Sequence, residues 1–378
     1  MSVNTSTHQT KLMHLIRFKN ISFTLLALLS SGSSVVGQAA VVLPVVPAGL
    51  NKKYALVTKP EHTATAIYTG EMVVPRLKPK EWLIFAAKPG NTPGQRVVSI
   101  DCTPATKVVR DQSPLHRDLF CARVPVTGAK NSSSIQFKMQ IQVELFSRSL
   151  VSRRGKASDI KITVNDRSNA LRRTKLFDYA SPTIQKWMET NKLHRKSREG
   201  EVDFARRVFQ QIVKQSTYEY LGNQNRSSSH VCSSKKSDCG GLSILFASAL
   251  RSQGVPARIR VGRWAQSAKA GEKVGSIIYH QEHVKAEFFA QGVGWVPADL
   301  SSAVLHDKTR KKLNYFGKDV GDFITLHHDT EISYDTVHFG IKTMDFLQKP
   351  AFWATGSGDF NGNSVKESWT VVKRAVKR

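Results

Sequence analysis

The sequence of 378 residues is 40% hydrophobic, and its 56 Lys and Arg outnumber its 29 Asp and Glu to give a formal net charge of +27. This length and apolar content suffice for a real hydrophobic core and allow two domains. The basic residues are spread along the chain instead of gathering in one patch with stacking aromatics. This distribution argues against a specific nucleic-acid partner. It leaves two interpretations open: a solvated surface that is simply basic, or attraction to an acidic polymer such as that of an anionic cell envelope.

Residues 1–39 are predicted to be a secretory signal peptide. Basic residues precede a short apolar run at 21–29, and small residues at 37–39 form a cleavage site. The apolar run is too short for a comfortable membrane span, and no later segment approaches the roughly 20 apolar residues that a spanning helix needs. We therefore expect a secreted or periplasmic protein of the cell envelope, with no membrane span once the signal is removed.

Residues 40–165 are expected to form a β-sandwich-like domain. Residues 134–146 alternate between apolar and polar side chains, which is typical of a strand with one buried and one solvated face. Shorter apolar runs bounded by Pro and Gly precede it, as in sandwich folds. Cys102 and Cys121 lie close together in this part of the sequence. Because an exported chain meets oxidising conditions, we expect them to form a structural disulfide.

Residues 166–378 are expected to form an α+β domain with helices packed on an antiparallel sheet. Ser181 and Pro182 are typical of the N-cap and first position of a helix, and two further stretches carry apolar residues at helical spacing. The predicted elements are helices beginning at 182, 202 and 239 and strands at 257–263, 283–289 and 295–301. Helices followed by strands indicate an α+β domain. We expect residues 301–378 to add a C-terminal β extension that continues this sheet or covers it.

Cys239 is a candidate nucleophile because it begins an apolar helix. The free amides and the dipole at a helix N-terminus favour a thiolate, and the N–H groups of Gly240 and Gly241 could stabilise an oxyanion. Such a thiol needs a base, and the base needs an orienting group. His283 lies on a predicted strand, opposite its apolar face, and Asp299 ends the next strand. Adjacent antiparallel strands can place these two side chains together.

Three sequence blocks resemble the transglutaminase-like superfamily of papain-type cysteine enzymes. They are SDCGGLSILFASALRSQGVPAR at 237–258, HVKAEFF at 283–289 and GVGWVPADLS at 292–301. Their order fits the family, with His283 placed 44 residues after Cys239 and Asp299 placed 16 residues further on. The resemblance covers about 181–300. It implies that Cys239 is the nucleophile, that His283 is the general base and acid, and that Asp299 orients the histidine.

The chain departs from the family pattern at two positions. Lys285 stands where many relatives carry an aromatic residue, which can alter the substrate groove, and Gly-Leu at 241–242 stands where many have an acidic residue. The family also uses a side chain upstream of the cysteine in its oxyanion hole. The candidates are Tyr218, Tyr220 and Gln224. Tyr218 is preferred because it follows the second predicted helix most directly.

Cys232 leaves a second interpretation open for Cys239, because two cysteines seven positions apart can close a small disulfide. Alternatively, Cys232 is a free thiol or a reversible redox latch on the nucleophile. No pair of Cys or His residues has the spacing of a zinc site, so we expect neither a metal nor a cofactor.

The sequence therefore predicts an exported acyl-transfer enzyme that hydrolyses a peptide or isopeptide bond of a protein or peptide substrate through a cysteine thioester. One alternative is a transglutaminase that cross-links proteins by using an amine acceptor. Another is a non-catalytic basic module that binds an anionic envelope polymer. The complete set of Cys, His and Asp argues against the binding module.

Overall fold

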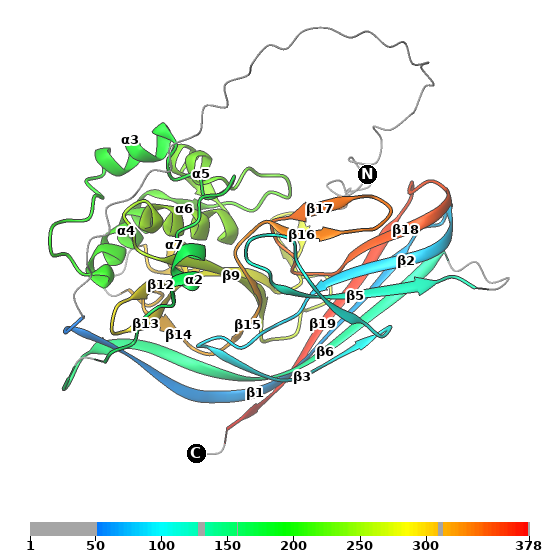
Figure 1. Ribbon diagram of the computed structural model, residues 1–378, viewed down its shortest axis with the longest axis horizontal. Coiled ribbons are helices and arrows are strands. Elements are labelled where there is room, and N and C mark those ends of the chain that lie inside the picture. Colours follow the sequence, from blue (N-terminus) through cyan, green and yellow to red (C-terminus); the bar gives the residue numbers. More distant parts are fainter. Residues whose placement is uncertain (1–50, 128–132, 157, 309–312, 377–378) are drawn as a thin grey trace, which may run out of the picture.

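The computed structural model describes residues 51–127, 133–156, 158–308 and 313–376 (Figure 1). A group of helices covers one side of a small sheet, and two long strands, β1 and β6, run along the other side of that sheet. The predicted signal peptide at 1–39 lies outside the described residues. No helix in the described part of the chain is long and apolar enough to cross a membrane.

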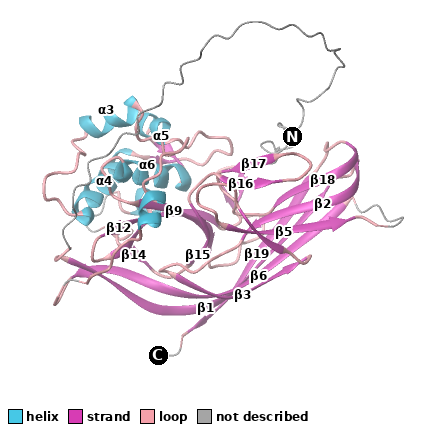
Figure 2. Ribbon diagram, viewed as in Figure 1, coloured by secondary structure: helices cyan, strands magenta, loops and turns pink. Residues whose placement is uncertain are grey.

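Two sheets with a common hydrophobic core form a sandwich (Figure 2). The first sheet contains β1 (Tyr54–Val73), β3 (Gln95–Thr103), β6 (Ser134–Ser152), β14 (Lys318–Asp319) and β19 (Ser364–Ala375). The second contains β2 (Leu77–Ala87), β4 (Lys107–Arg110), β5 (Asp118–Pro125) and β18 (Ala351–Gly358). Phe137 of β6 and Trp82 of β2 are both buried in the shared core.

The alternation predicted for residues 134–146 is confirmed in β6. Phe137, Met139 and Ile141 are buried, while the polar residues between them remain partly or fully exposed. β6 lies between β1 and β3 and pairs antiparallel with both. Because successive side chains of a strand point to opposite faces, this pattern allows β6 to bury one face in the sandwich and expose the other.

The last two strands complete the sandwich, which is therefore built from both ends of the described chain. β19 pairs antiparallel with β1, and β18 pairs antiparallel with β2 (Figure 1). Trp369 of β19 is buried in the sandwich core. The expectation that residues 301–378 extend or cover the sheet of the second domain is thus wrong for these strands, although it is right for β15 (Phe323–His328), which pairs with β9 (Ala257–Trp264). Their apolar faces pack between the two sandwich sheets, and their pairing partners are far away in the sequence.

A second layer consists of helices packed on an antiparallel sheet, which confirms the predicted α+β class. The sheet order is β13 (Gly294–Ala298), β12 (Glu282–Ala290), β9 (Ala257–Trp264) and β15 (Phe323–His328). The helices are α2 (Val164–Asn169), α3 (Pro182–Thr190), α4 (Glu201–Gln215), α5 (Ser228–Ser234), α6 (Cys239–Arg251) and α7 (Leu300–His306). The short strands are β7 (Thr217–Tyr218), β8 (Lys236–Ser237), β10 (Lys273–Val274), β11 (Ile277–Ile278), β16 (Ile332–Asp335) and β17 (Ile341–Met344).

Three predicted helix starts agree with the structure. α3 begins at Pro182 after the N-cap Ser181, whose hydroxyl accepts a hydrogen bond from the N–H of Ile184 at 3.3 Å. α4 buries the predicted apolar stripe in the core beneath the helices. α6 begins at Cys239, and Gly254 lies just beyond its end with a φ of +71°. Glycine adopts this left-handed conformation without the strain that a side chain would cause.

The polar face of β12 is buried and not solvated. Val284 and its apolar neighbours pack against the helices, as predicted, but His283, Lys285 and Glu287 on the other face are also buried. The reason is that this face packs against the sandwich. The carboxylate of Glu287 there receives a hydrogen bond from the guanidinium of Arg148 in β6 at 3.1 Å. A period-two pattern reveals which residues share a face, but it cannot reveal that another sheet will cover the polar face with opposite charges.

All four cysteines are unbonded thiols. The expected disulfide between Cys102 and Cys121 is therefore not formed. Cys102 lies on β3 of the first sandwich sheet, and Cys121 lies on β5 of the second. The two cysteines are close in sequence, but their strands do not pair with each other. Cys232 is likewise not bonded to Cys239. It is buried in α5, where its thiol donates to the carbonyl of Ser229 at 3.2 Å.

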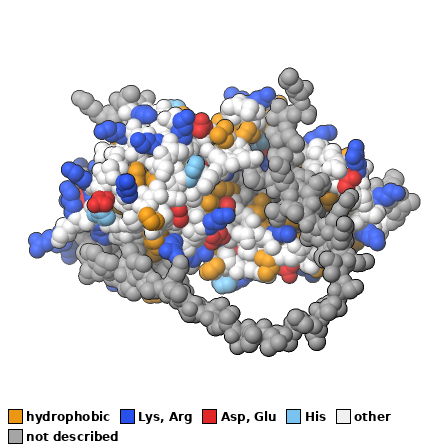
Figure 3. Space-filling model, turned by 90° about the horizontal axis from the view of Figure 1, so that it is seen from above, with side chains coloured by type: hydrophobic (Ala, Val, Ile, Leu, Met, Phe, Trp, Pro, Cys, Tyr) orange, Lys and Arg blue, Asp and Glu red, His pale blue; other side chains and the backbone are white. Residues whose placement is uncertain are grey.

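Lys and Arg side chains are scattered over the face shown in Figure 3 and do not gather in one place. Some basic residues do not contribute to the surface at all. The side chains of Arg148, Arg251, Arg260 and Arg263 are at most 1% exposed and form ion pairs with Asp or Glu. Because each buried pair also removes an acidic side chain from the surface, the exposed surface keeps the positive balance of the sequence.

Candidate active site

Cys239 is the first residue of α6, as the sequence predicts, and the residue before it caps the helix. Asp238 accepts a hydrogen bond from the N–H of Gly241 at 3.0 Å through one carboxylate oxygen. Its other oxygen accepts two hydrogen bonds, at 2.8 and 2.6 Å, from the guanidinium of Arg226. The amide of Gly241 is therefore occupied by the cap and is not free to stabilise an oxyanion, contrary to the expectation from the sequence.

The thiol opens onto a cleft of about 140 Å³ between α6, β12 and the loops around them. The cleft is lined by Tyr218, Tyr220, Arg226, Asp238, Cys239, Gly240, Val274, Tyr279, Glu282, Val284, Phe346 and Gln348. Aromatic rings supply much of this wall, while Glu282 and the Arg226–Asp238 pair supply its charges. The lining is therefore suited to a substrate that offers both apolar and polar groups to the sulfur.

The surroundings of Cys239 hold its thiol in the neutral form. Burial raises the pKa of the thiol most strongly, and the neighbouring carboxylate of Asp238 raises it further. The guanidinium of Arg226 and the N–H of Val284 act in the opposite direction but do not overcome these effects. The sequence predicts a pKa lowered by the helix N-terminus. Burial of the thiol reverses that prediction, and the charge of the aspartate that caps the helix adds to the effect.

His283 and Asp299 are brought together as the sequence predicts. β12 and β13 are antiparallel neighbours, and the Nε2 of His283 lies 2.9 Å from the Oδ2 of Asp299. The second oxygen of Asp299 caps α7 by accepting the N–H of Ser302 at 3.1 Å. Burial alone would raise the pKa of Asp299, but His283 and the other donors lower it to about 2. The carboxylate is therefore ionised, fixed in position and able to orient the imidazole.

Both the thiol of Cys239 and the imidazole of His283 lie at β12. The sulfur of Cys239 lies beside the N–H of Val284, the residue that follows His283. Because Nε2 of His283 is engaged by Asp299, Nδ1 is the ring nitrogen left for a thiol. Among the described residues, no hydrogen bond joins Cys239 to the ring. Proton transfer between them therefore requires a closer approach or a rotation of a side chain.

Two aromatic residues that the sequence does not mark as functional enclose the imidazole. The indole of Trp264 stacks on His283 with ring centroids 4.3 Å apart and planes at 20°. Phe323 of β15 contacts the same ring edge-on, with centroids 6.0 Å apart. Trp264 ends β9, the strand paired with β12, so only the pairing of these strands reveals its role. The two rings restrict the orientation of the imidazole and limit water around it.

Tyr218, the preferred oxyanion candidate, lies at the cleft. β7 and β8 pair in parallel and place Tyr218 beside Ser237, two residues before Cys239. Tyr220 also lines the cleft, whereas Gln224 is not part of its lining. Burial raises the pKa of Tyr218, and the nearby Cys239 raises it further, so its hydroxyl remains protonated and can donate a hydrogen bond.

Other residues also line the cleft, although no pattern in the sequence around them indicates this. Arg226 comes from a polar loop, Phe346 from the segment between β17 and β18, and Glu282 from the position before the histidine. Among the described residues, no group of three or more His, Cys, Asp or Glu side chains is placed to hold a metal ion. The arrangement offers a thiol and an imidazole–carboxylate pair, the groups that nucleophilic catalysis by cysteine requires.

Comparison with protein families identifies the segment that carries these residues. Residues 190–300 match the family model of the transglutaminase-like superfamily, and this range includes Cys239, His283 and Asp299. Together with the antiparallel sheet and the helix that begins at the cysteine, the match confirms the resemblance stated from the sequence blocks. Residues 190–300 are a transglutaminase-like domain.

Solved structures provide a second comparison. A candidate cysteine protease from Cytophaga hutchinsonii is similar with a TM-score of 0.53 and 11% identity, covering 85% of this chain and 93% of its own, which shows a shared fold. The periplasmic domain of TgpA from Pseudomonas aeruginosa matches at 0.31 and 11% identity, covering 69% and 96%. A TGase matches at 0.24 and 16% identity, covering 48% of each chain. TM-scores as low as the last two do not establish a shared fold. None of the curated proteins shows significant sequence similarity to it.

Proposed function

We propose that this protein is an exported cysteine enzyme that hydrolyses a peptide or isopeptide amide through a thioester on Cys239. The observation that carries the proposal is the pairing of His283 with Asp299 at 2.9 Å on the strand beside a thiol that opens onto a cleft. The transglutaminase-like match over residues 190–300 supports the same chemistry. A thiol with no imidazole–carboxylate pair beside it would support only a structural cysteine.

In the first half of the reaction, the sulfur of Cys239 attacks the amide carbonyl carbon while its proton passes to Nδ1 of His283. The carbonyl oxygen becomes an oxyanion, and the protonated hydroxyl of Tyr218 donates a hydrogen bond to it. The C–N bond then breaks, and His283 gives its proton to the departing amine. The products of this half are a free amine and an acyl thioester on Cys239.

In the second half, water attacks the thioester carbonyl while His283 accepts one of its protons. The C–S bond breaks, the thiolate recovers the proton from His283, and a carboxylic acid leaves. Asp299 stays ionised throughout and stabilises the imidazolium that forms in each half. Because the surroundings of Cys239 favour the neutral thiol, His283 acts as a true base toward it as the substrate binds.

Export and an anionic partner are part of the same proposal. The signal-like sequence at 1–39 supports a secreted or periplasmic location. The excess of Lys and Arg over Asp and Glu, scattered over the surface in Figure 3, supports retention on an anionic polymer of the envelope close to a protein or peptide substrate.

Alkylation of the purified protein by iodoacetamide tests the nucleophile. We expect Cys239 to react at least about 10-fold faster than Cys232, quantified by peptide mass spectrometry near neutral pH, and His283→Ala to abolish this difference. Cys232→Ala is the matched control and should leave the reaction of Cys239 unchanged. A reaction of Cys239 no faster than that of Cys232, or one that is unchanged in His283→Ala, would refute the enzyme.

A second assay separates hydrolysis from transfer to an amine. The protein is incubated with a glutamine-rich protein, with and without a fluorescent primary amine, and with Cys239→Ala as the control. We expect new amino termini or released ammonia that depend on Cys239, with little incorporation of the amine. Strong incorporation without hydrolysis would replace the hydrolase by a cross-linking transglutaminase.

A further inference from the structure

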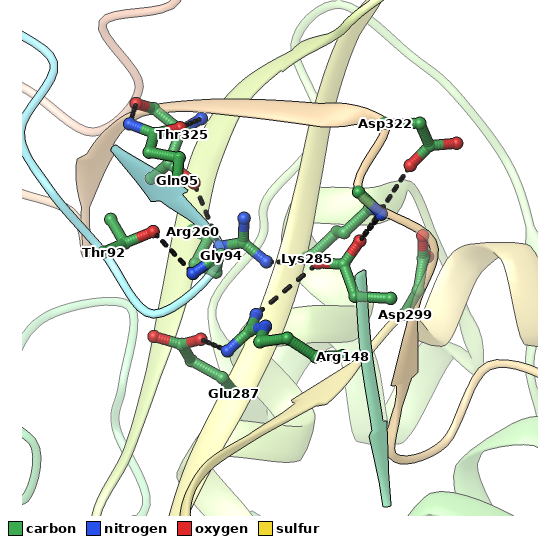
Figure 4. A network of polar contacts seen from close by, with 12 residues as sticks. Thr92, Gly94, Gln95, Arg148, Arg260, Lys285, Glu287, Asp299, Asp322 and Thr325 are labelled. Carbon is green, nitrogen blue, oxygen red and sulfur yellow. Dashed lines mark hydrogen bonds and ion pairs between the residues drawn. The ribbon is translucent and has the colours of Figure 1, made fainter. Parts of the chain in front are cut away.

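Lys285 is buried in an ion network between the sandwich and the sheet that contains β12 (Figure 4). Its ammonium lies 3.4 Å from Asp319 and 3.3 Å from Asp322. Asp319 also accepts hydrogen bonds from Arg260 of β9 at 2.6 Å and from Arg148 of β6 at 3.5 Å. The network therefore joins strands of both layers, and Lys285 is its member two residues from His283 on the same face of β12.

The same ammonium also contacts the aromatic rings that enclose the imidazole. The Nζ of Lys285 lies 4.4 Å from the ring centroid of Trp264 and 5.1 Å from that of Phe323. Trp264 in turn stacks on His283. A cation over an aromatic face is attracted by the negative charge on that face, and the attraction is larger when the cation is removed from water. Lys285 thus contacts the same indole that holds His283.

Gly262 makes room for this arrangement. It pairs with His283 across β9 and β12. A Cβ on Gly262 would lie 2.0 Å from the carbonyl oxygen of Ile324, so any side chain there would push β15 away. Since β15 carries Phe323, the whole set of rings around the imidazole depends on this close packing.

We propose that Lys285 is a positioning residue for the proposed reaction. It fixes the imidazole of His283 through Trp264, and its charge, held in the ion network between the two layers, sets the electrostatic environment of that imidazole. The proposal rests on the proposed function, because it assigns the role of Lys285 to the base of that reaction. It replaces the expectation that Lys285 alters the substrate groove: the side chain is buried among Asp319, Asp322 and Trp264 and does not line the cleft.

The sign of the electrostatic effect follows from the groups that face Lys285. Its ammonium contacts the anions Asp319 and Asp322 and acts on the charge of Asp299, while the cations Arg260 and Arg148 share Asp319 with it. A positive charge near an imidazole disfavours its protonated form, and a negative charge favours it. Neutralising Lys285 should therefore stabilise the imidazolium, whereas neutralising Asp322 should destabilise it. A loss of packing alone would not give opposite signs.

The test uses NMR of protein with ¹³C-labelled histidine in a Cys239→Ala background, so that the ring titrates without coupling to the thiol. His283→Gln identifies the signal. Lys285→Met removes the charge at nearly constant volume, Lys285→Arg keeps the charge, and Asp322→Asn removes the partner carboxylate. Two quantities are followed for the His283 ring: the midpoint of its titration and the upfield ring-current shift that stacking on Trp264 produces.

We expect Lys285→Met to move the midpoint upward by about 0.5–1 pH unit and to reduce the ring-current shift. Asp322→Asn should move the midpoint downward, and Lys285→Arg should retain both wild-type values. Unchanged values in Lys285→Met, or shifts of the same sign in Lys285→Met and Asp322→Asn, would overturn the proposal. Alkylation of Cys239 in the wild-type background is measured separately. An unreactive Cys239 refutes the enzyme, whereas a reactive Cys239 with an unmoved ring refutes only the role of Lys285.

Discussion

Replacement of Asp299 by Asn tests how the carboxylate supports the base. The pKa of Asp299 falls from its ordinary 3.8 to about 2, a difference of about 1.8 units, even though burial opposes the fall. At about 1.36 kcal/mol for each pKa unit, its partners favour the ionised form by about 2 kcal/mol net of burial. His283 is the largest of those partners. The neutral amide that replaces the carboxylate in the variant has no charge to offer the imidazolium, so transition-state stabilisation of about this size should be lost.

We therefore expect Asp299→Asn to slow the alkylation of Cys239 near neutral pH by about 30-fold, the factor that corresponds to about 2 kcal/mol. Ser301→Ala is the matched control. It removes the hydroxyl that donates to Asp299 at 3.3 Å but leaves the carboxylate and its bond to His283 in place, so its rate should change less than about threefold. A rate for Asp299→Asn within about twofold of wild type, in a folded protein, would show that Asp299 does not support the base.

Three further outcomes are expected from the contacts of individual side chains. Glu282→Gln should reduce the preference of Cys239 for a cationic over an anionic thiosulfonate reagent by roughly 3- to 10-fold, because Glu282 brings a partly exposed carboxylate to the cleft. An unchanged ratio of the two reaction rates would refute this. Since the folded-state pKa of Asp299 is depressed, the ionised carboxylate stabilises the fold above about pH 4, and this contribution is lost as the pH falls toward about 2. Over that interval, the free energy of unfolding in urea should fall less for Asp299→Asn than for the wild type. Parallel plots of the free energy of unfolding against pH would contradict this. Trp369→Ala should lower the free energy of unfolding in urea by about 3–5 kcal/mol, since Trp369 is 1% exposed and its indole N–H donates to the carbonyl of Trp264 at 2.9 Å. A decrease of less than about 1 kcal/mol would show that β19 is dispensable for the sandwich.

Local patterns of the sequence predict individual elements well. Ser181 and Pro182 specify the start of α3, because a serine cap and a proline with its fixed φ suit the first turn of a helix. The strict alternation at 134–146 specifies the faces of β6. In both cases the residues that determine the structure are neighbours in the chain, so their chemistry can be read directly.

Predictions that depended on distant partners failed or were incomplete. Closeness in sequence suggested a disulfide between Cys102 and Cys121, but the two cysteines lie on strands of different sheets. The C-terminal strands were expected to extend or cover the sheet of the second domain. β15 does pair with β9 of that sheet, but β18 and β19 pair with β2 and β1 from the beginning of the described chain. Strand pairing is set by the fit of whole apolar faces, and short apolar segments do not encode which partner they will find.

The candidate site divides in the same way. The sequence by itself determined that Cys239 begins a helix, that His283 lies on a strand with Asp299 at the end of the next strand, and that these three residues resemble those of the transglutaminase-like superfamily. Only the tertiary structure decided the surroundings of these residues. It brought Arg226 to Asp238, stacked Trp264 on His283 and buried Lys285 against acidic residues of the domain interface. Electrostatic and aromatic contacts depend on distances between residues that are far apart in the sequence, so these surroundings exist only in the folded chain.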